Sequence, residues 1–446
     1  MKVLWLCNIV LPAIASKLNM EVSNKEGWIS GMADTLLERQ AENGIELSVA
    51  FPVEEGELPQ GRRIGSITCY GFREDLRHAE IYDETLEPSL KKIVDKVQPD
   101  IVHCFGTEFP HTLAMCRVFP RKERLLVGMQ GLCTLIAEAY QANLPGEVIS
   151  SVTLRDILRG DSLRRQQEKY VRRGETEREI VGIAGNIAGR TEWDRRYTRE
   201  WNPKARYFEI NESLRSVFYG PRWDPGKVEP RSIFMSQGDY PLKGLHYMLK
   251  AMPVILEKYP EAKLYVAGNS LVRYGTIREK LKISAYGVYL RRLIAEGGLG
   301  ERVVFLGKLD ERQMLERYLG SSLYVCASSV ENSPNSLGEA MILGMPCVCA
   351  AVGGIPSLFE DGRDGICYRG YEEPGEEELE TVSRRLADAV TGMWDHPERM
   401  EAYCAHAADH AGRTHDRERN YRRLLEIYGE IQRESGGTKR EGSICI

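Results

Sequence analysis

The stretch that decides the fold is Glu331-Asn332-Ser333-Pro334-Asn335-Ser336-Leu337-Gly338-Glu339-Ala340-Met341, which places two glutamates eight positions apart. An apolar, strand-like run at 323–327 precedes it, and a second one at 346–350 follows it. The Pro, Asn and Ser residues between the glutamates are typical of the start of a helix. Strand, loop, helix and strand in this order predict a βαβ unit, in which the helix N-terminus offers unpaired N–H groups to a phosphate.

The two glutamates add a second kind of chemistry to this unit. An ionised carboxylate only accepts hydrogen bonds, so Glu331 and Glu339 are suited to sugar hydroxyls. A tight turn, 353–356, follows the second strand. The alternative interpretation is that Glu331 is a solvated loop acid and Glu339 a partner of the helix dipole. The segment therefore has the parts needed to hold a sugar and a phosphate together.

Strand and helix patterns alternate on both sides of this unit. That alternation predicts an α/β protein with parallel sheets and helices on both faces. In the first half, strands are expected at 3–7, 45–50, 101–104, 125–129 and 180–184, an amphipathic helix at 29–37 and another helix at 86–97. In the second half, strands are expected at 232–236, 263–267 and 303–306, a helix at 244–259 and further helices over 376–433.

A Pro- and Gly-rich stretch at 214–231 is the best candidate for a domain boundary. We therefore expect an N-terminal domain at 1–215, a linker at 216–231 and a C-terminal domain at 232–404. Helices at 405–433 complete the chain, and the polar tail at 434–446 is expected to be disordered.

Composition narrows the function classes. The chain has 446 residues, a net charge of −5 and a pI near 6.0, which gives no basic face for nucleic acid. Eleven scattered cysteines without a C-x-x-C pair predict reduced, buried thiols in a cytosolic protein. The apolar N-terminal run is expected to be a strand rather than a signal peptide, because Asn8 and Pro12 interrupt it. No apolar stretch is long enough to span a bilayer.

Taken in order, Glu331, Glu339-Ala340-Met341, Gly344-Met345-Pro346 and Gly353-Gly354-Ile355-Pro356 resemble the E-x7-E signature of family 4 glycosyltransferases. These are retaining enzymes of the GT-B fold. The resemblance is strongest over 231–370 and weaker around 1–50 and 99–106. It implies two Rossmann-like, doubly wound domains facing a cleft, with the last helices crossing back onto the N-terminal domain.

The resemblance also implies a reaction, the transfer of a hexose from a nucleotide diphosphate sugar to a hydroxyl group. Negative charge then develops on the leaving diphosphate, and preorganised cations and N–H groups can stabilise it. Lys243 matches the lysine of the family, with Gly238 at the start of the same loop. Asp239 stands where the family usually has an arginine. A solvated lysine at a helix start is the plainer alternative for Lys243. Because no D-x-D appears in a loop-like context, no metal is expected.

The same comparison assigns the donor-binding residues. Glu339 is expected to accept hydrogen bonds from the ribose, and Glu331 to face the transferred sugar. Asn335 and Ser336 would offer donors beside it. Gly27 matches a glycine loop that lets the backbone approach the phosphates, although the family commonly has a pair of glycines there.

In the N-terminal domain, Gln130 stands where the family has an active-site histidine. Glutamine cannot act as a base, but it can bind a sugar hydroxyl, and the leaving phosphate can take the proton of the acceptor. His103 ends a predicted strand at the ligand-binding edge of the sheet, where it serves either a substrate or the core. Glu108 is similarly placed. Arg190 either points into the cleft or forms an ion pair with a nearby acid.

The partners that follow are a nucleotide sugar and a carbohydrate or lipid-linked acceptor, such as a growing polysaccharide or another glycoconjugate, with no nucleic acid. The stretch 155–178 holds eight Arg or Lys residues and five acids. It is either a solvated helix of ion pairs or a peripheral contact with an anionic membrane. The expected location is the cytoplasm, where the second alternative would place the protein at the inner face of the membrane.

Two rival functions stay open at this stage. A nucleotide-sugar epimerase or hydrolase of the same fold would need its own acid or base in the N-terminal domain, which Gln130 does not supply. A non-catalytic, glycosyltransferase-like partner protein would account for the missing arginine and histidine. Such a protein would have no reason to keep Glu331, Glu339 and Lys243.

Overall fold

The computed structural model describes residues 1–18, 20, 27–54, 56–272, 276–372 and 376–437. The chain divides into two compact units. Unit 1 comprises 1–134, 170–213 and the chain from His415 onward, and unit 2 comprises 135–169 and 214–414.

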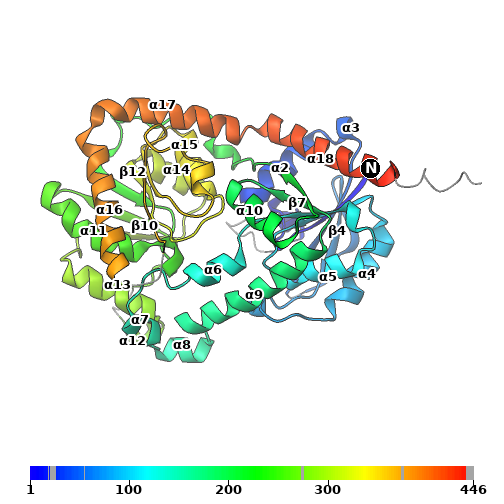
Figure 1. Ribbon diagram of the computed structural model, residues 1–446, viewed down its shortest axis with the longest axis horizontal. Coiled ribbons are helices and arrows are strands. Elements are labelled where there is room, and N and C mark those ends of the chain that lie inside the picture. Colours follow the sequence, from blue (N-terminus) through cyan, green and yellow to red (C-terminus); the bar gives the residue numbers. More distant parts are fainter. Residues whose placement is uncertain (19, 21–26, 55, 273–275, 373–375, 438–446) are drawn as a thin grey trace, which may run out of the picture. The chain divides into compact units, whose positions relative to one another are not determined.

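Unit 1 is built on an eight-stranded sheet with the order β3-β4-β2-β1-β5-β6-β7-β8 (Figure 1). Neighbouring strands are parallel except for the antiparallel pair β3 and β4. The central strands are buried along their whole length, which explains their continuous apolar runs. The strands are β1 (Lys2–Leu6), β2 (Glu46–Pro52), β3 (Gln60–Ile64), β4 (Ile67–Phe72), β5 (Ile101–Phe105), β6 (Leu125–Gly128), β7 (Asn186–Gly189) and β8 (Arg206–Glu209).

Amphipathic helices cover this sheet. The helix expected at 86–97 is α4 (Leu86–Val97), and its five apolar positions are all buried. The other helices of unit 1 are α1 (Pro12–Leu18), α2 (Gly27–Glu38), α3 (Gln40–Asn43), α5 (Pro110–Val118), α10 (Glu192–Trp201) and α18 (Arg417–Gly437). The boundaries between the units fall within α6 (Cys133–Ala139) and α9 (Leu163–Ile183).

Unit 2 has a six-stranded parallel sheet with the order β11-β10-β9-β12-β13-β14. Its strands are β9 (Glu229–Met235), β10 (Lys263–Ala267), β11 (Val303–Gly307), β12 (Ser321–Cys326), β13 (Cys347–Ala350) and β14 (Ile366–Tyr368). Its helices are α7 (Gly146–Ser150), α8 (Leu154–Arg159), α11 (Leu245–Lys258), α12 (Ile277–Lys280), α13 (Ala285–Glu296), α14 (Glu311–Leu319), α15 (Asn335–Ile342), α16 (Glu376–Asp395) and α17 (Pro397–Thr414).

The strand expected at 180–184 is wrong. These residues end α9, and the strand is β7, which begins at Asn186. Ile180, Val181 and Ala184 are buried while Gly182 is exposed, which is the spacing of a helix face. A short apolar run does not distinguish a buried strand from a buried helix end.

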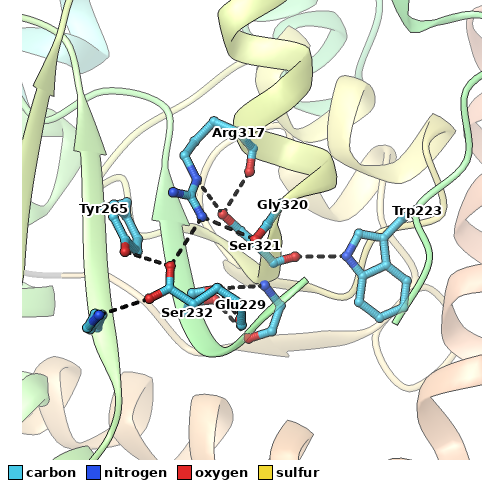
Figure 2. A network of polar contacts seen from close by, with 9 residues as sticks. Trp223, Glu229, Ser232, Tyr265, Arg317, Gly320 and Ser321 are labelled. Atoms are coloured by element: carbon cyan, nitrogen blue, oxygen red, sulfur yellow. Dashed lines mark hydrogen bonds and ion pairs between the residues drawn. The ribbon is translucent and has the colours of Figure 1, made fainter. Parts of the chain in front are cut away.

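The stretch 216–231, expected to be a linker, instead packs onto the sheet of unit 2. Trp223 donates its indole hydrogen to Ser321 O at 2.8 Å, and Arg222 donates to Ile342 O at 2.7 Å. Figure 2 shows how the network continues at the start of β9, where Glu229 accepts a hydrogen bond from Tyr265 at 2.6 Å. The stretch is therefore part of unit 2.

Residues 135–169, expected in the N-terminal domain, cluster with unit 2. His246 of α11 shares a hydrogen bond with Ala142 O at 2.7 Å, and Tyr247 donates to Asn143 Oδ1 at 2.7 Å. These buried contacts were invisible in the sequence because their partners are 104 positions apart.

The C-terminal helices divide between the two units. Helix α17 clusters with unit 2, whereas α18 packs on unit 1 beside α2 (Figure 1). Trp5 donates its indole hydrogen to Tyr428 Oη at 2.9 Å, and that hydroxyl also bonds His103. The disorder expected from Glu434 is wrong for 434–437, which continue α18, while 438–446 lie outside the described residues.

The cysteines and the helix lengths can be compared with the sequence expectations. The ten cysteines in the described part of the chain are all unpaired, and eight are buried. No helix among the described residues combines the length and the apolarity needed to cross a bilayer.

Candidate functional site at the carboxyl edge of the unit 2 sheet

The candidate site lies where the chain leaves β9 and β12. These neighbouring strands mark the point at which the strand order changes direction, because β10 and β11 continue on one side of β9 and β13 and β14 on the far side of β12. In open α/β sheets, ligands bind beyond the carboxyl ends of the strands at such a point. The loop after β9 carries Lys243, and the loop after β12 carries Glu331.

Lys243 and Glu331 form an ion pair between these two loops. Their side chains are 21% and 14% exposed, respectively. Ser328 donates a hydrogen bond to Glu331 Oε1 at 2.8 Å. Burial is the largest single influence on the pKa of Lys243 and lowers it, but Glu331, Tyr240 and Cys326 together raise it more, so the net direction is upward and the ammonium is charged. Two of the four residues predicted to be catalytic, Lys243 and Glu331, are therefore in direct contact.

Three glycines make this arrangement possible. Gly244 has φ +70°, and a Cβ there would lie 1.8 Å from Ala327 O, at the end of β12. A Cβ on Gly353 would lie 2.0 Å from Glu331 O, and Gly354 donates its N–H to that same carbonyl at 2.9 Å. The glycines after Lys243 and in the 353–356 turn thus let two loops approach the site closely.

Glu339 lies in α15 and is buried, with a side chain 5% exposed. Arg215 contacts its Oε1 with Nη2 at 2.8 Å and Nε at 2.9 Å, and Tyr318 donates to Oε2 at 3.3 Å. Burial raises the pKa of Glu339, and Arg215 acts against that rise. Arg215 was missed by the sequence analysis because nothing in its local pattern marks a partner 124 positions away.

The start of α15 is held by two buried tyrosines. Tyr324 donates to Ser336 Oγ at 2.9 Å, and Tyr318 donates to Ser336 O at 3.0 Å. Asn335 is the first residue of α15, after Pro334. The expected donor residues Asn335 and Ser336 therefore lie at the helix N-terminus, between the two glutamates.

Gly238 and Asp239 line the same loop as Lys243. A Cβ on Gly238 would lie 2.8 Å from Leu245 Cδ2, so this glycine allows the loop to pack against α11. Asp239 Oδ2 accepts a hydrogen bond from Asn269 at 2.7 Å, while its buried Oδ1 has no hydrogen-bond partner in the described part of the chain. Asp239 therefore does not replace the cation of the family pattern, and the second half-buried cation of this edge is Arg215.

The remaining predicted residues belong to unit 1. Gly27 begins α2, and residues 21–26 before it lie outside the described residues. His103 is 3% exposed, bonds Tyr428 Oη at 2.8 Å and stacks on Phe105 with ring centroids 3.9 Å apart. Burial lowers its pKa to about 3, so the imidazole is neutral at physiological pH. His103 thus serves the core of unit 1 while one side faces a small pocket.

That pocket, about 30 Å³ in volume, lies within unit 1 and is lined by Gln130, Arg190 and Glu212 among others. Gln130 donates to Glu212 Oε1 at 3.1 Å, and Arg190 pairs with the same oxygen at 3.0 Å. The ion-pair alternative for Arg190 is therefore confirmed. Glu108 accepts from Gly131 N at 2.9 Å, and its buried Oε2 has no partner among the described residues.

A search of the described residues finds no group of three or more His, Cys, Asp or Glu side chains arranged to hold a metal ion. The charged groups at the carboxyl edge of the unit 2 sheet are two cation–carboxylate pairs. An anionic ligand could bind there by taking the place of a carboxylate beside each cation.

Residues 222–391 match the family described as Glycosyl transferases group 1. This segment covers less than half of the chain but includes Lys243, Glu331 and Glu339. The chain is similar to D-inositol 3-phosphate glycosyltransferase 2 of Catenulispora acidiphila, with 29% identity over 166 residues, or 35% of this chain and 36% of that protein. It is also similar to phosphatidyl-myo-inositol mannosyltransferase of Mycobacterium leprae, with 25% identity over 45% of this chain and 46% of that protein. The chain thus matches less than half the length of these curated relatives.

Solved structures match over nearly the whole chain. Sucrose-phosphate synthase from Thermosynechococcus elongatus aligns with a TM-score of 0.66 and 14% identity, covering 97% of this chain and 100% of that one. Anabaena Alr3699/HepE in complex with UDP-glucose aligns with a TM-score of 0.62 and 15% identity, covering 96% of this chain and 100% of that one. The chain has the GT-B fold.

The predicted site residues divide between the two units. The expectation of two Rossmann-like domains is confirmed, because each unit carries a parallel α/β sheet of its own. Unit 2 brings Lys243 to Glu331, and it buries Glu339 beside Arg215. Gln130 and His103 line one pocket of unit 1.

Proposed function

We propose that this protein transfers a hexose from a nucleoside diphosphate sugar to a hydroxyl of a carbohydrate or lipid-linked acceptor, with retention of configuration and without a metal ion. The observation that carries the proposal is the pair of half-buried cation–carboxylate contacts, Lys243–Glu331 and Arg215–Glu339, at one edge of the unit 2 sheet. A nucleoside diphosphate sugar needs both a cation for its phosphates and a carboxylate for its hydroxyls.

The donor would bind at this edge by separating the two ion pairs and contacting their charged groups itself. Its diphosphate would take Lys243 and the N–H groups at the start of α15, which point toward an anion at a helix N-terminus. Glu339 would accept hydrogen bonds from the ribose hydroxyls, and Glu331 would face the sugar. Lys243 and these N–H groups are preorganised, so they would stabilise the charge that grows on the leaving phosphate.

Retention would follow from an attack on the same face of the sugar as the departing diphosphate. In that geometry the leaving phosphate oxygen accepts the proton of the acceptor hydroxyl, so no protein base is required. The neutral His103 and the amide Gln130 are compatible with this route, since neither has to carry a proton. Gln130 would bind a hydroxyl group, and we place the acceptor on unit 1.

Names of relatives support the substrate class without fixing it. Two of them act, by name, on inositol phosphate or phosphatidyl-inositol acceptors, and Anabaena Alr3699/HepE was solved with UDP-glucose. UDP-sugars are therefore the first donors to test. We place the reaction in the cytoplasm, because the described cysteines are unpaired and mostly buried.

The test is a thermal-shift panel of UDP, GDP, ADP and CMP with their common sugars, in the absence of metal. A ligand at a hundred times its dissociation constant stabilises the state it binds by about 2.7 kcal/mol, which raises the melting midpoint by several degrees. The Glu339→Ala variant should lose the shift, while Glu316→Ala, an exposed acid of α14, should keep it. Proton NMR of the product then reports the anomeric configuration.

Each alternative function predicts a different result in these measurements. Release of free sugar at the same rate with and without acceptor would identify a hydrolase, and interconversion of nucleotide sugars would identify an epimerase. No shift with any nucleotide, or a shift that survives Glu339→Ala, would contradict the proposed site and favour a non-catalytic partner protein.

A further inference from the structure

The short helix α8 of unit 2 turns its apolar side chains toward solvent. Leu154, Ile157 and Leu158 are 53%, 63% and 77% exposed, and Val152 just before the helix is 51% exposed. Single exposed apolar residues are common on protein surfaces, but four within seven positions form a patch.

Polar contacts fix this orientation. Thr153 and Asp156 form a capping box at the start of α8. Asp156 is 2% exposed and accepts a hydrogen bond from Ala285 N at 2.9 Å, while Thr153 donates to Ile283 O at 2.8 Å. The polar side of α8 is thus anchored to the start of α13, so the apolar side cannot rotate inward without breaking these bonds.

The segment before α13, which holds α8 in place, contributes a further exposed apolar residue. Leu281, two positions before Ile283, is 52% exposed. Figure 1 shows α8 beside α12 and α7 within unit 2, as the bond from Thr153 to Ile283 requires. We call the set Val152, Leu154, Ile157, Leu158 and Leu281 the α8 patch.

Four cations lie close in sequence to the α8 patch. Arg159, Arg164, Arg165 and Lys282 are exposed, and none of them forms an ion pair within the described ranges of the chain. Of the acids in the same stretch, Asp161 pairs with Arg155 at 2.6 Å, Asp156 is buried and Glu168 is exposed. Over 152–168 and 281–282 the exposed side chains therefore carry a net positive charge, although the whole protein carries a net charge of −5.

We propose that the α8 patch docks this protein onto the surface of an anionic lipid bilayer. Apolar side chains at the interface between headgroups and acyl chains, surrounded by cations that attract anionic headgroups, are the two features that hold peripheral proteins on such surfaces. A second copy of this chain is a poorer occupant, since a two-fold contact would bring the same cations together. The inference goes beyond the proposed transfer reaction and does not depend on it.

The test is co-sedimentation of the full chain with two kinds of vesicle, phosphatidylcholine alone and phosphatidylcholine mixed with phosphatidylglycerol. We expect binding to the mixed vesicles and little to the neutral ones. Binding should weaken as salt is raised, because the Debye length falls from about 10 Å at 0.1 M to about 3 Å at 1 M.

Two double variants separate the contributions. Ile157→Ser with Leu158→Ser should lower the vesicle partition coefficient about tenfold through lost apolar burial. Arg164→Ser with Arg165→Ser should lower it by a similar factor and weaken its salt dependence. Ile81→Ser is the matched control, because Ile81 is 57% exposed in unit 1, and it should bind like the wild type.

Three outcomes would overturn the proposal: no binding to anionic vesicles, equal binding to both kinds of vesicle, or binding that neither double variant reduces. Light scattering across a concentration series tests the rival occupant. A dimer that Ile157→Ser with Leu158→Ser dissociates, without any vesicle binding, would assign the patch to self-association. If that variant does not fold by its thermal melt, the charge variant decides alone.

Discussion

The carboxyl edges of the two sheets differ in how their polar groups are assembled. In unit 2, Lys243 and Glu331 come from the loops that follow two neighbouring strands, β9 and β12, and Glu339 from the helix after the second loop. In unit 1, by contrast, the pocket takes polar residues from four places, with His103 in β5, Gln130 after β6, Arg190 after β7 and Glu212 after β8. Two glutamates within one short segment leave a pattern in the sequence, whereas single residues from four segments do not.

The charges of the two edges differ as well. The edge in unit 2 holds two half-buried cations against two carboxylates, so an anionic ligand can replace a carboxylate at each. Unit 1 has one buried guanidinium, that of Arg190, and a neutral imidazole, that of His103. This contrast predicts that donor binding and charge stabilisation depend on unit 2, while substitutions in unit 1 act on stability and acceptor recognition.

The largest effect should come from Lys243→Met. Loss of the cation that we propose faces the leaving diphosphate should lower kcat about 10³-fold, which corresponds to about 4 kcal/mol of transition-state stabilisation. Steady-state kinetics with the best donor from the nucleotide panel measure it. Lys250→Met is the control, because Lys250 lies on α11 in an ion pair with Glu380. If both variants lose activity equally, the contrast between the site and the rest of unit 2 fails.

The next largest effect concerns Gly244, which lets the loop after β9 pack against the end of β12. Gly244→Ala should destabilise unit 2 by about 3 kcal/mol or more, because it adds a Cβ at φ +70° and 1.8 Å from Ala327 O. Gly298→Ala is a matched control at φ +62° with nothing within 4 Å, so only the backbone strain of about 1 kcal/mol remains. Urea unfolding compares them, and equal losses would show that the contact with β12 is unimportant.

Loss of the Arg215–Glu339 ion pair should have a smaller effect than loss of Lys243. Arg215→Met leaves Glu339 buried without its cation, which favours the protonated carboxyl and weakens it as an acceptor. Nucleotide affinity should fall about tenfold, or about 1.4 kcal/mol, with a smaller change in kcat than Lys243→Met causes. Calorimetry measures the affinity, and exposed Arg312→Met serves as control. An unchanged affinity would remove Glu339 from the nucleotide site.

The smallest effect is a pH dependence shared by both units. Burial lowers the pKa of His103 in unit 1 to about 3 and that of His246 in unit 2 to about 4. Below about pH 6.5 the unfolded chain takes up protons at these positions while the folded chain does not, so stability falls as pH falls.

Each histidine should contribute about 1 kcal/mol between pH 6.5 and 5.5, and His103→Gln should remove its share. The free energy of unfolding, measured at both pH values, tests this. The exposed His78→Gln should keep the wild-type slope. A slope that His103→Gln does not change would mean that His103 is protonated in the folded state.

Local patterns account for much of the fold. Strand β10 occupies the expected residues 263–267, and α4 occupies 86–97, because each combines apolar periodicity with a clear stop. The strand predicted at 180–184 is the end of helix α9, because a short apolar run fits both structures. Arg215 escaped prediction for a different reason, as an arginine in a Pro- and Gly-rich stretch has no local feature that names its partner.

The sequence by itself determined the alternation of strands and helices that makes an α/β fold with two parallel sheets, and it marked Lys243, Glu331 and Glu339 as candidates, since these depend on spacing along the chain. Only the tertiary structure decided that 135–169 packs on unit 2, that Arg215 pairs with Glu339 and that α8 faces solvent with its apolar side. Those features depend on burial and on contacts between residues roughly a hundred or more positions apart, and chain-local periodicity carries no information about either.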